Sequence, residues 1–193
     1  MLDNLNKYAI ILASKSPRRR SLLKMLDIDF ETTSVDVEES FDKDLGPAEA
    51  AVYLAEKKAK AYAAGHDPGN ELLITADTLV CIRDKILGKP ESFGDAMEIL
   101  RSLSGHWHTV VSGVCLKTAD AERSFFSSTQ VHFKKLSDEE ILYYIENYKP
   151  YDKAGAYGIQ EWIGYIGIDS IRGSFYNVMG LPVQRLYEEL KGF

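Results

Sequence analysis

The spacing of apolar and polar positions along the chain predicts strands and helices in alternation. Continuous or alternating apolar runs predict extended segments at 8–13, 30–37, 72–82, 86–87, 106–117, 123–134 and 162–168. Apolar positions three and four apart, with the capping residues Ser16, Ser92 and Ser137 before three of the segments, predict helices at 17–27, 47–64, 93–104, 138–148 and 183–191. The segments at 106–117 and 123–134 are joined by a short polar turn, which predicts an antiparallel ribbon. We find no repeat or linker, so the pattern predicts an α/β chain that folds over residues 1–193 as one domain or as two closely packed lobes.

The first strand is followed by a small hydroxyl-rich turn and a basic helix start. Ser16 has the N-cap position, Pro17 the first helical position, and three arginines follow. Positive charges in the first turn of a helix are destabilised by the helix dipole. A bound anion would reverse this effect, because it would pair with the arginines and accept hydrogen bonds from the free backbone N–H groups. The turn therefore predicts a phosphate site in which Ser14 and the arginines donate. A solvated basic helix start is the alternative, and a Walker A loop is absent from the sequence.

Two charged residues stand in otherwise apolar surroundings. Asp77 interrupts the run 72–82, and a buried carboxylate is costly unless it is paired or coordinated. Lys58 falls on the same helical face as Ala51, Ala55 and Tyr62, where a lysine needs either a partner or a path to solvent. Both residues are therefore candidates for a functional site.

Glycine-rich loops carry the next two candidates. Lys89 lies between Gly88 and Pro90 and projects from a fixed loop, although a solvated turn lysine is the alternative. The segment 151–160 combines small residues with Lys153 and Gln160, which is typical of a recognition loop that lets the backbone approach a ligand.

Composition narrows the class of protein. The chain has 193 residues, of which 45% are hydrophobic and 27% charged, with a net charge of -6. An acidic chain argues against nucleic-acid and membrane-surface partners, which usually need a basic field. No apolar run approaches the roughly 18 residues of a membrane span, so we expect a cytoplasmic protein. Cys81 and Cys115 are expected as buried free thiols, and His108 as a structural strand residue.

The candidates have complementary chemistry. Basic side chains could surround a phosphate chain, and two carboxylates, Glu39 and Asp77, could hold a divalent cation and activate a water molecule. The basic candidates are Arg18, Arg19, Lys58, Lys89 and Lys153. Charge neutralisation, a metal ion and an in-line nucleophile are what phosphoryl and nucleotidyl displacement needs, so the residues favour a polyphosphate hydrolase.

Short motifs are spread over nearly the whole chain. They are Ala13-Ser14-Lys15-Ser16-Pro17-Arg18-Arg19, Lys58-Ala59, Ala76-Asp77-Thr78, Gly88-Lys89-Pro90, Asp152-Lys153-Ala154-Gly155-Ala156-Tyr157-Gly158-Ile159-Gln160, Gly173-Ser174 and Gly180-Leu181-Pro182. In these motifs, which occur in the family's order and together are very specific, the chain resembles the Maf family of nucleoside triphosphate pyrophosphatases.

The resemblance implies an α/β fold similar to that of inosine triphosphate pyrophosphatases, with an elongated curved mixed sheet, flanking helices and a cleft between two lobes. It implies cleavage between the α and β phosphates with a divalent cation, Mg2+ in the first place and Mn2+ or Co2+ as alternatives. It also implies a branch that takes dTTP and UTP, without distinguishing these from modified pyrimidine nucleotides. A homodimer is a further expectation.

The resemblance assigns roles residue by residue. By this resemblance Asp77 corresponds to the general base. Glu39, rather than Glu38, corresponds to a ligand of the metal or of a water molecule. The expected phosphate contacts are Arg19, Lys58, Lys89 and Lys153. Arg18, Thr78 and Gln160 match positions of base choice, and the Gln160 amide could pair with the imide edge of thymine or uracil. Three positions depart from the family pattern, namely Glu161 for a glycine, Phe175 for a tyrosine and Ser112 for a threonine.

Two rival functions stay open at this point. One is a nucleotide-sensing regulatory protein of cell division or septum formation, with little turnover. The other is a phosphatase that removes the terminal phosphate and releases orthophosphate. A DNA-binding module is disfavoured because the basic residues are scattered within an acidic chain.

Overall fold

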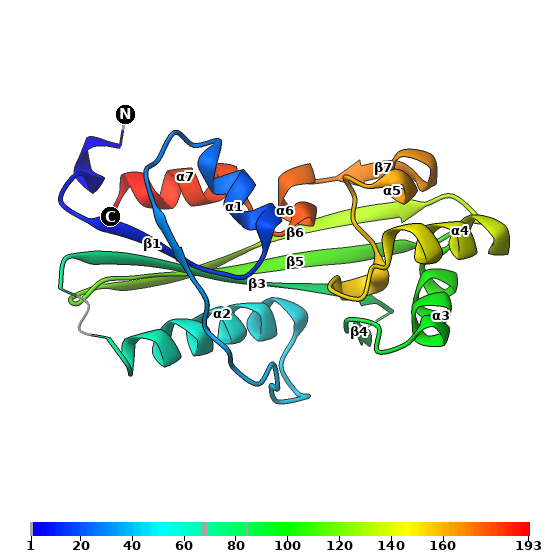
Figure 1. Ribbon diagram of the computed structural model, residues 1–193, viewed down its shortest axis with the longest axis horizontal. Coiled ribbons are helices and arrows are strands. Elements are labelled where there is room, and N and C mark those ends of the chain that lie inside the picture. Colours follow the sequence, from blue (N-terminus) through cyan, green and yellow to red (C-terminus); the bar gives the residue numbers. More distant parts are fainter. Residues whose placement is uncertain (1, 67–68, 84) are drawn as a thin grey trace. The chain divides into compact units, whose positions relative to one another are not determined.

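The computed structural model describes residues 2–66, 69–83 and 85–193 and shows a mixed α/β fold (Figure 1). The strands are β1 (Ala9–Ala13), β2 (Glu31–Thr33), β3 (Glu71–Ile82), β4 (Lys85–Leu87), β5 (Trp107–Lys117), β6 (Glu122–Phe133) and β7 (Ile168–Arg172). The helices are α1 (Pro17–Lys24), α2 (Pro47–Ala63), α3 (Phe93–Leu103), α4 (Asp138–Tyr148), α5 (Trp162–Gly167), α6 (Phe175–Met179) and α7 (Val183–Lys191), with short 3-10 turns η1 (Asp3–Leu5) and η2 (Ala154–Ala156). In the part of the chain described, no helix is long and apolar enough to cross a membrane.

The strands form one sheet in the order β2-β1-β3-β5-β6-β7, with β4 paired to β3. The β1 strand is parallel to β2 and β3, whereas β4 and β7 are antiparallel to their neighbours. The chain divides into two compact units. The first comprises Met1–Asp77, Ser112–Ser127 and Gly180–Phe193, and the second Thr78–Val111 and Ser128–Met179.

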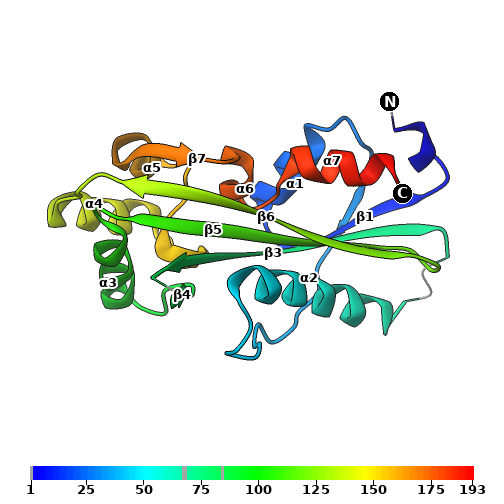
Figure 2. The same cartoon turned by 180° about the vertical axis from the view of Figure 1, so that it is seen from behind.

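In the first unit, α2 lies on one face of the strands while α1 and α7 lie on the other, as Figures 1 and 2 both show. The helix α2 begins at Pro47, where the Glu49 carboxylate accepts the Gly46 N–H at 3.0 Å. Its small residues allow a close approach, because a Cβ on Gly113 of β5 would lie 2.3 Å from the backbone of Ala51. The Thr75 hydroxyl of β3 also donates to the Ala55 carbonyl at 2.7 Å. These contacts fix α2 against β3 and β5.

The second unit has its own apolar core. It is built from β3, β5 and β6 residues together with α3, α4 and the segment 154–163, and it includes Val80, Phe133, Tyr144 and Ile163. The helix α4 begins with a capping box in which Ser137 and Glu140 each bind the other's backbone N–H. It ends at Lys149, which has a left-handed conformation. Helix α3 packs against α4 and η2.

Most of the predicted elements are confirmed, including the α/β class and the Ser16, Ser92 and Ser137 caps. The free, buried thiols of Cys81 and Cys115 are confirmed too. The predicted strand at 30–37 is shorter, since only Glu31–Thr33 pairs with β1. Helix α6 was not predicted. The sequence predicts a hairpin turn at 83–85, between the extended segments 72–82 and 86–87, and Asp84 of this turn lies outside the described residues.

The predicted strand at 162–168 is wrong, because residues Trp162–Gly167 form helix α5 and the strand β7 begins only at Ile168. Its large apolar residues suggested a strand, but Ile163 packs into the core of the second unit with Trp162 and Ile166 beside it. Gly164 also permits a tight turn, because a Cβ there would lie 1.9 Å from the Ile159 carbonyl oxygen. Tertiary packing therefore overrides the local preference.

Gly113→Ala should destabilise the protein by about 2 kcal/mol or more, because the added methyl group would overlap the α2 backbone. Urea unfolding followed by circular dichroism measures the change. Gly94→Ala in the first turn of α3 is the matched control, since its Cβ would meet only the Ser92 hydroxyl at 3.9 Å. A Gly113→Ala midpoint equal to that of the wild type would contradict the close approach.

His108 is buried in β5 as predicted, with Nε2 2.7 Å from the Tyr157 hydroxyl oxygen, and burial lowers its pKa to about 4 from 6.5. The unfolded chain therefore binds this proton at higher pH than the folded protein does. Between pH 6.5 and pH 4 the free energy of unfolding should fall by about 3 kcal/mol through this group. His108→Gln should flatten that part of the stability profile in urea titrations, whereas exposed His66→Gln should not. An unchanged slope in His108→Gln would refute the assignment.

Candidate functional site

The first unit contains six of the ten predicted site residues: Ser14, Arg18, Arg19, Glu39, Lys58 and Asp77. The Asp77 side chain is buried in β3 and its carboxylate binds the ammonium group of Lys58. The same ammonium donates to Glu39 Oε1 at 3.0 Å. One lysine therefore bridges two carboxylates, which excludes the solvent-directed alternative for Lys58.

The secondary structure places this pair. Lys58 lies one turn beyond Ala55, whose carbonyl is held by Thr75 two residues before Asp77. The side chains of Lys58 and Asp77 are 12% and 8% exposed, so their charges are largely removed from water. Such a pair is stable only if each charge keeps its partner.

The turn after β1 adds a guanidinium group to the same unit. Ser16 Oγ accepts the Arg19 N–H at 3.4 Å, and the Arg19 side chain donates from Nε to the Gly180 carbonyl at 2.7 Å. Its Nη1 lies 3.5 Å from Ser14 Oγ. Burial lowers the pKa of Arg19, while the carboxylate charges of Asp77 and Glu39 act in the opposite direction. Arg19 therefore belongs electrostatically to the carboxylate pair, and its charge persists because arginine does not deprotonate in proteins.

Asp77 and Glu39 are the residues that could hold the expected divalent cation. Their carboxylates already converge on one cationic group, the Lys58 ammonium. The described residues contain no cluster of three or more histidine, cysteine, aspartate or glutamate side chains that could hold a metal ion alone. Mg2+ commonly takes one or two protein carboxylates and completes its shell with substrate phosphates and water, so two carboxylates suffice.

The second unit contains the other four predicted residues, Thr78, Lys89, Lys153 and Gln160. Lys89 is exposed in the loop after β4, and this loop is tied to the segment 151–160 because the Gly155 N–H donates to the Gly88 carbonyl at 3.1 Å. Thr78 is partly buried in β3, directly after Asp77. The two loops with the predicted lysines are thus connected through their backbones.

Lys153 is almost completely buried. Its Nζ lies 2.7 Å from Asp152 Oδ1 and 3.2 Å from Glu161 Oε1. Seven residues further on, Gln160 has a buried Oε1 that accepts no hydrogen bond within the described part of the chain. Lys153 is therefore fixed by two carboxylates, and Gln160 has a buried acceptor that the described residues leave without a donor.

Sequence reasoning missed Tyr144 and the partner role of Glu161. The Tyr144 hydroxyl donates to Glu161 Oε2 and accepts the Gly158 N–H at 3.0 Å. Tyr144 lies on α4 among core residues, so its position on an apolar helical face gave no signal of a polar role. Glu161 did carry a signal, because it is a departure from the family pattern inside the candidate loop.

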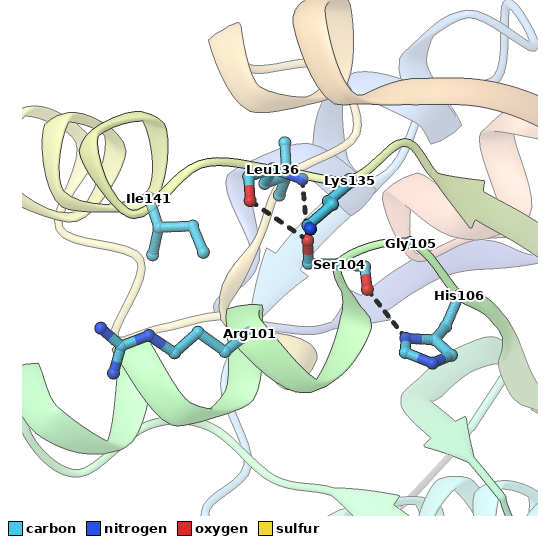
Figure 3. Close-up of a pocket in the computed structure, with 7 residues that line it drawn as sticks. All are labelled: Arg101, Ser104, Gly105, His106, Lys135, Leu136 and Ile141. Atoms are coloured by element: carbon cyan, nitrogen blue, oxygen red, sulfur yellow. Dashed lines mark hydrogen bonds between the residues drawn. The ribbon is translucent and has the colours of Figure 1, made fainter.

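A separate cavity of about 460 Å3 opens between α3, the start of β5 and the segment before α4 (Figure 3). Its lining residues are Arg101, Ser104, Gly105, His106, Lys135, Leu136 and Ile141, none of which is a predicted site residue.

The chief polar groups of this cavity already have partners. The Arg101 guanidinium makes two hydrogen bonds of 2.9 Å to the Asp138 carboxylate. His106 has Nδ1 2.8 Å from the Ser104 carbonyl oxygen and Nε2 2.7 Å from a nitrogen of Arg83. Because no predicted site residue lines this cavity, it is not our candidate active site.

The mixed α/β fold and the lysine-bridged carboxylates with a neighbouring arginine define a protein with the groups that phosphoryl chemistry requires. The chain belongs to the Maf family: the family model described as Maf-like protein matches residues 9–193.

Curated relatives match over nearly their full length. The dTTP/UTP pyrophosphatase of Bacteroides thetaiotaomicron is 56% identical over 99% of both chains. The protein of the same name from Parabacteroides distasonis is 55% identical over 100% of both. That of Flavobacterium johnsoniae is 51% identical over 97% of this chain and 96% of its own.

Lys58→Met should destabilise the folded protein by about 3 kcal/mol, because it leaves the buried Asp77 carboxylate without its ammonium partner. The exposed Lys60→Met on the same helix should be close to neutral. The double variant Lys58→Met with Asp77→Asn should be more stable than Lys58→Met alone, since the unpaired charge is gone. Urea unfolding of the wild type, Lys58→Met, Asp77→Asn, their double variant and the Lys60→Met control tests this, and strictly additive effects of the two site substitutions would argue against a coupled pair.

Proposed function

We propose that this protein hydrolyses dTTP and UTP between the α and β phosphates, giving the nucleoside monophosphate and pyrophosphate. The observation that carries the proposal is the buried Asp77 carboxylate, which shares the Lys58 ammonium group with the Glu39 carboxylate. The positive charge of Arg19 interacts electrostatically with both carboxylates. Its full-length relatives named dTTP/UTP pyrophosphatase support the substrate class.

In this mechanism the Asp77 carboxylate accepts a proton from the water that attacks the α phosphorus. A bond forms between the water oxygen and phosphorus, and the bond to the oxygen that bridges the α and β phosphates breaks. The electron pair of that bond leaves with pyrophosphate. Lys58 orients the Asp77 carboxylate through its contact with Oδ1, so that Oδ2 can take the proton.

Cationic side chains neutralise the charge that develops. The Arg19 guanidinium, with its planar set of donors, suits the phosphate oxygens, and Ser14 adds a hydroxyl beside it. Asp77 and Glu39 would hold a divalent cation, in the first place Mg2+, with Mn2+ or Co2+ as alternatives. Such an ion supplies neutralisation of the phosphate charge and polarisation of the phosphoryl oxygens when bound.

Gln160 accounts for the base preference. The imide edge of thymine and uracil presents an N–H donor between two carbonyl acceptors, and a primary amide has both an acceptor and donors. The buried Oε1 of Gln160 accepts no hydrogen bond from the described residues and could accept this N–H. Cytosine has an acceptor at that ring nitrogen, so it would leave the Gln160 oxygen unpaired. Arg18 and Thr78 are further candidates for base choice, and Lys89 and Lys153 for phosphate contacts.

A cytoplasmic location, a homodimer and the absence of nucleic-acid partners also belong to this proposal. The acidic net charge of -6 supports the last of these.

Asp77→Asn should lower pyrophosphate release from dTTP and UTP by about two to four orders of magnitude, because the amide cannot accept the proton. Purified protein with magnesium and a panel of nucleoside triphosphates, assayed separately for pyrophosphate and orthophosphate, measures this. Asp120→Asn in the exposed turn after β5 is the matched control and should retain wild-type rates.

Three results would overturn parts of the proposal. Activity of Asp77→Asn within about tenfold of the wild type would remove Asp77 from the general-base role. Orthophosphate as the product would indicate the phosphatase. Stoichiometric binding of nucleotide without turnover would indicate the nucleotide-sensing protein of cell division.

A further inference from the structure

The Glu161 carboxylate joins two parts of the segment 151–160. One oxygen, Oε1, lies 3.2 Å from Lys153 Nζ, and the other, Oε2, accepts the hydroxyl of Tyr144. The Tyr144 hydroxyl in turn accepts the N–H of Gly158 at 3.0 Å. A chain of contacts thus runs from the ammonium of Lys153 to the backbone two residues before Gln160.

This network is largely shielded from water, and that gives it rigidity. Tyr144 is fully buried in the core of the second unit, and the Glu161 side chain is only 20% exposed. Burial together with the Glu161 carboxylate raises the pKa of Tyr144, so its hydroxyl keeps its proton and remains the donor. Buried polar groups in such a network lose stability if any one partner is removed.

The backbone of the segment is shaped to receive the carboxylate. A Cβ on Gly158 would lie 2.7 Å from the Glu161 carboxyl carbon, so the carboxylate packs directly on a glycine. The Glu161 N–H also donates to the Gly158 carbonyl at 3.0 Å, which closes a turn around Ile159 and Gln160. Gln160 therefore lies in a turn whose two ends are held by Glu161.

We propose that Glu161, anchored by Tyr144, is a positioning residue that fixes Lys153 and Gln160 in one frame and thereby sets the discrimination between uracil and cytosine nucleotides. The inference rests on the proposed function, in which Lys153 contacts phosphate and Gln160 contacts the base. Glu161 and Tyr144 act through these two residues and need not touch the substrate.

Two variants test the frame from its two sides. Tyr144→Phe removes the hydroxyl that joins Glu161 to Gly158, and Glu161→Gln removes the charge that holds Lys153. Tyr148→Phe is the matched control, because it deletes the same group from the same helix and its ring stacks on Tyr144 with centroids 5.1 Å apart. The Tyr148 side chain is 39% exposed and has no hydrogen bond to the loop within the described part of the chain.

Steady-state kinetics on UTP and CTP give the first measurement. Both test variants should lower the UTP-to-CTP ratio of kcat/KM by about tenfold and raise KM for UTP, since a misplaced amide loses one discriminating hydrogen bond. The kcat on UTP should stay within about threefold, because Asp77 and Lys58 are unchanged. Tyr148→Phe should match the wild type.

Amide hydrogen exchange of the segment 154–161 gives a second measurement that needs no substrate. Tyr144→Phe should speed exchange at Gly158 by about tenfold or more, because its N–H loses its acceptor. Folded variants with faster exchange and an unchanged UTP-to-CTP ratio would overturn the positioning role and leave a structural one. Unchanged exchange and an unchanged ratio would overturn the frame itself. A wild-type protein that releases no pyrophosphate would instead refute the proposed function, and the positioning role with it.

Discussion

A buried carboxylate in the middle of an apolar strand constrains the first unit more than any other feature. Asp77 is 6% exposed, and a charge so placed requires a cation within contact distance. Lys58 supplies it only because α2 lies close to the sheet, where Gly113 leaves room for the helix backbone and Thr75 holds the Ala55 carbonyl. The buried charge of Asp77 therefore depends directly on the close packing of α2 on the sheet.

The second unit also contains a buried lysine that two carboxylates neutralise. Lys153 is buried and lies between two carboxylates, Asp152 and Glu161, as Lys58 lies between Asp77 and Glu39. Each lysine is thus held in place before any ligand arrives, and little side-chain entropy remains to be lost on binding. The carboxylates that hold these lysines also contribute to the acidic net charge, which explains how a phosphate-binding chain can be acidic overall.

The sequence predicted features whose cause is local. The strand around Asp77 and the caps at Ser16, Ser92 and Ser137 depend on neighbours within a few residues. The inward position of Lys58 followed from helical periodicity, but its partner could not, because Asp77 is 19 residues away. The link from Tyr144 to Glu161 spans 17 residues and depends on how α4 packs. Helix α5 was mispredicted for the same reason, since its aromatic and β-branched residues favour a strand until packing decides otherwise.

The ion pairs of Lys58 and Lys153 also determine which experiments can separate a structural role of a residue from a role in catalysis or binding. Where a charged residue stabilises the fold and serves the substrate, a loss of activity alone does not distinguish the two effects. For Asp77, the proposed general base, the distinction lies in the loss of pyrophosphate release by Asp77→Asn compared with the coupling of its stability to Lys58. For Glu161 it lies in a ratio between two substrates, because a general loosening of the fold changes both rates alike, whereas a displaced Gln160 changes the balance between them. The ratio of activities on two substrates therefore tests the role of Glu161, and the free energy of unfolding tests the ion pair of Lys58 and Asp77.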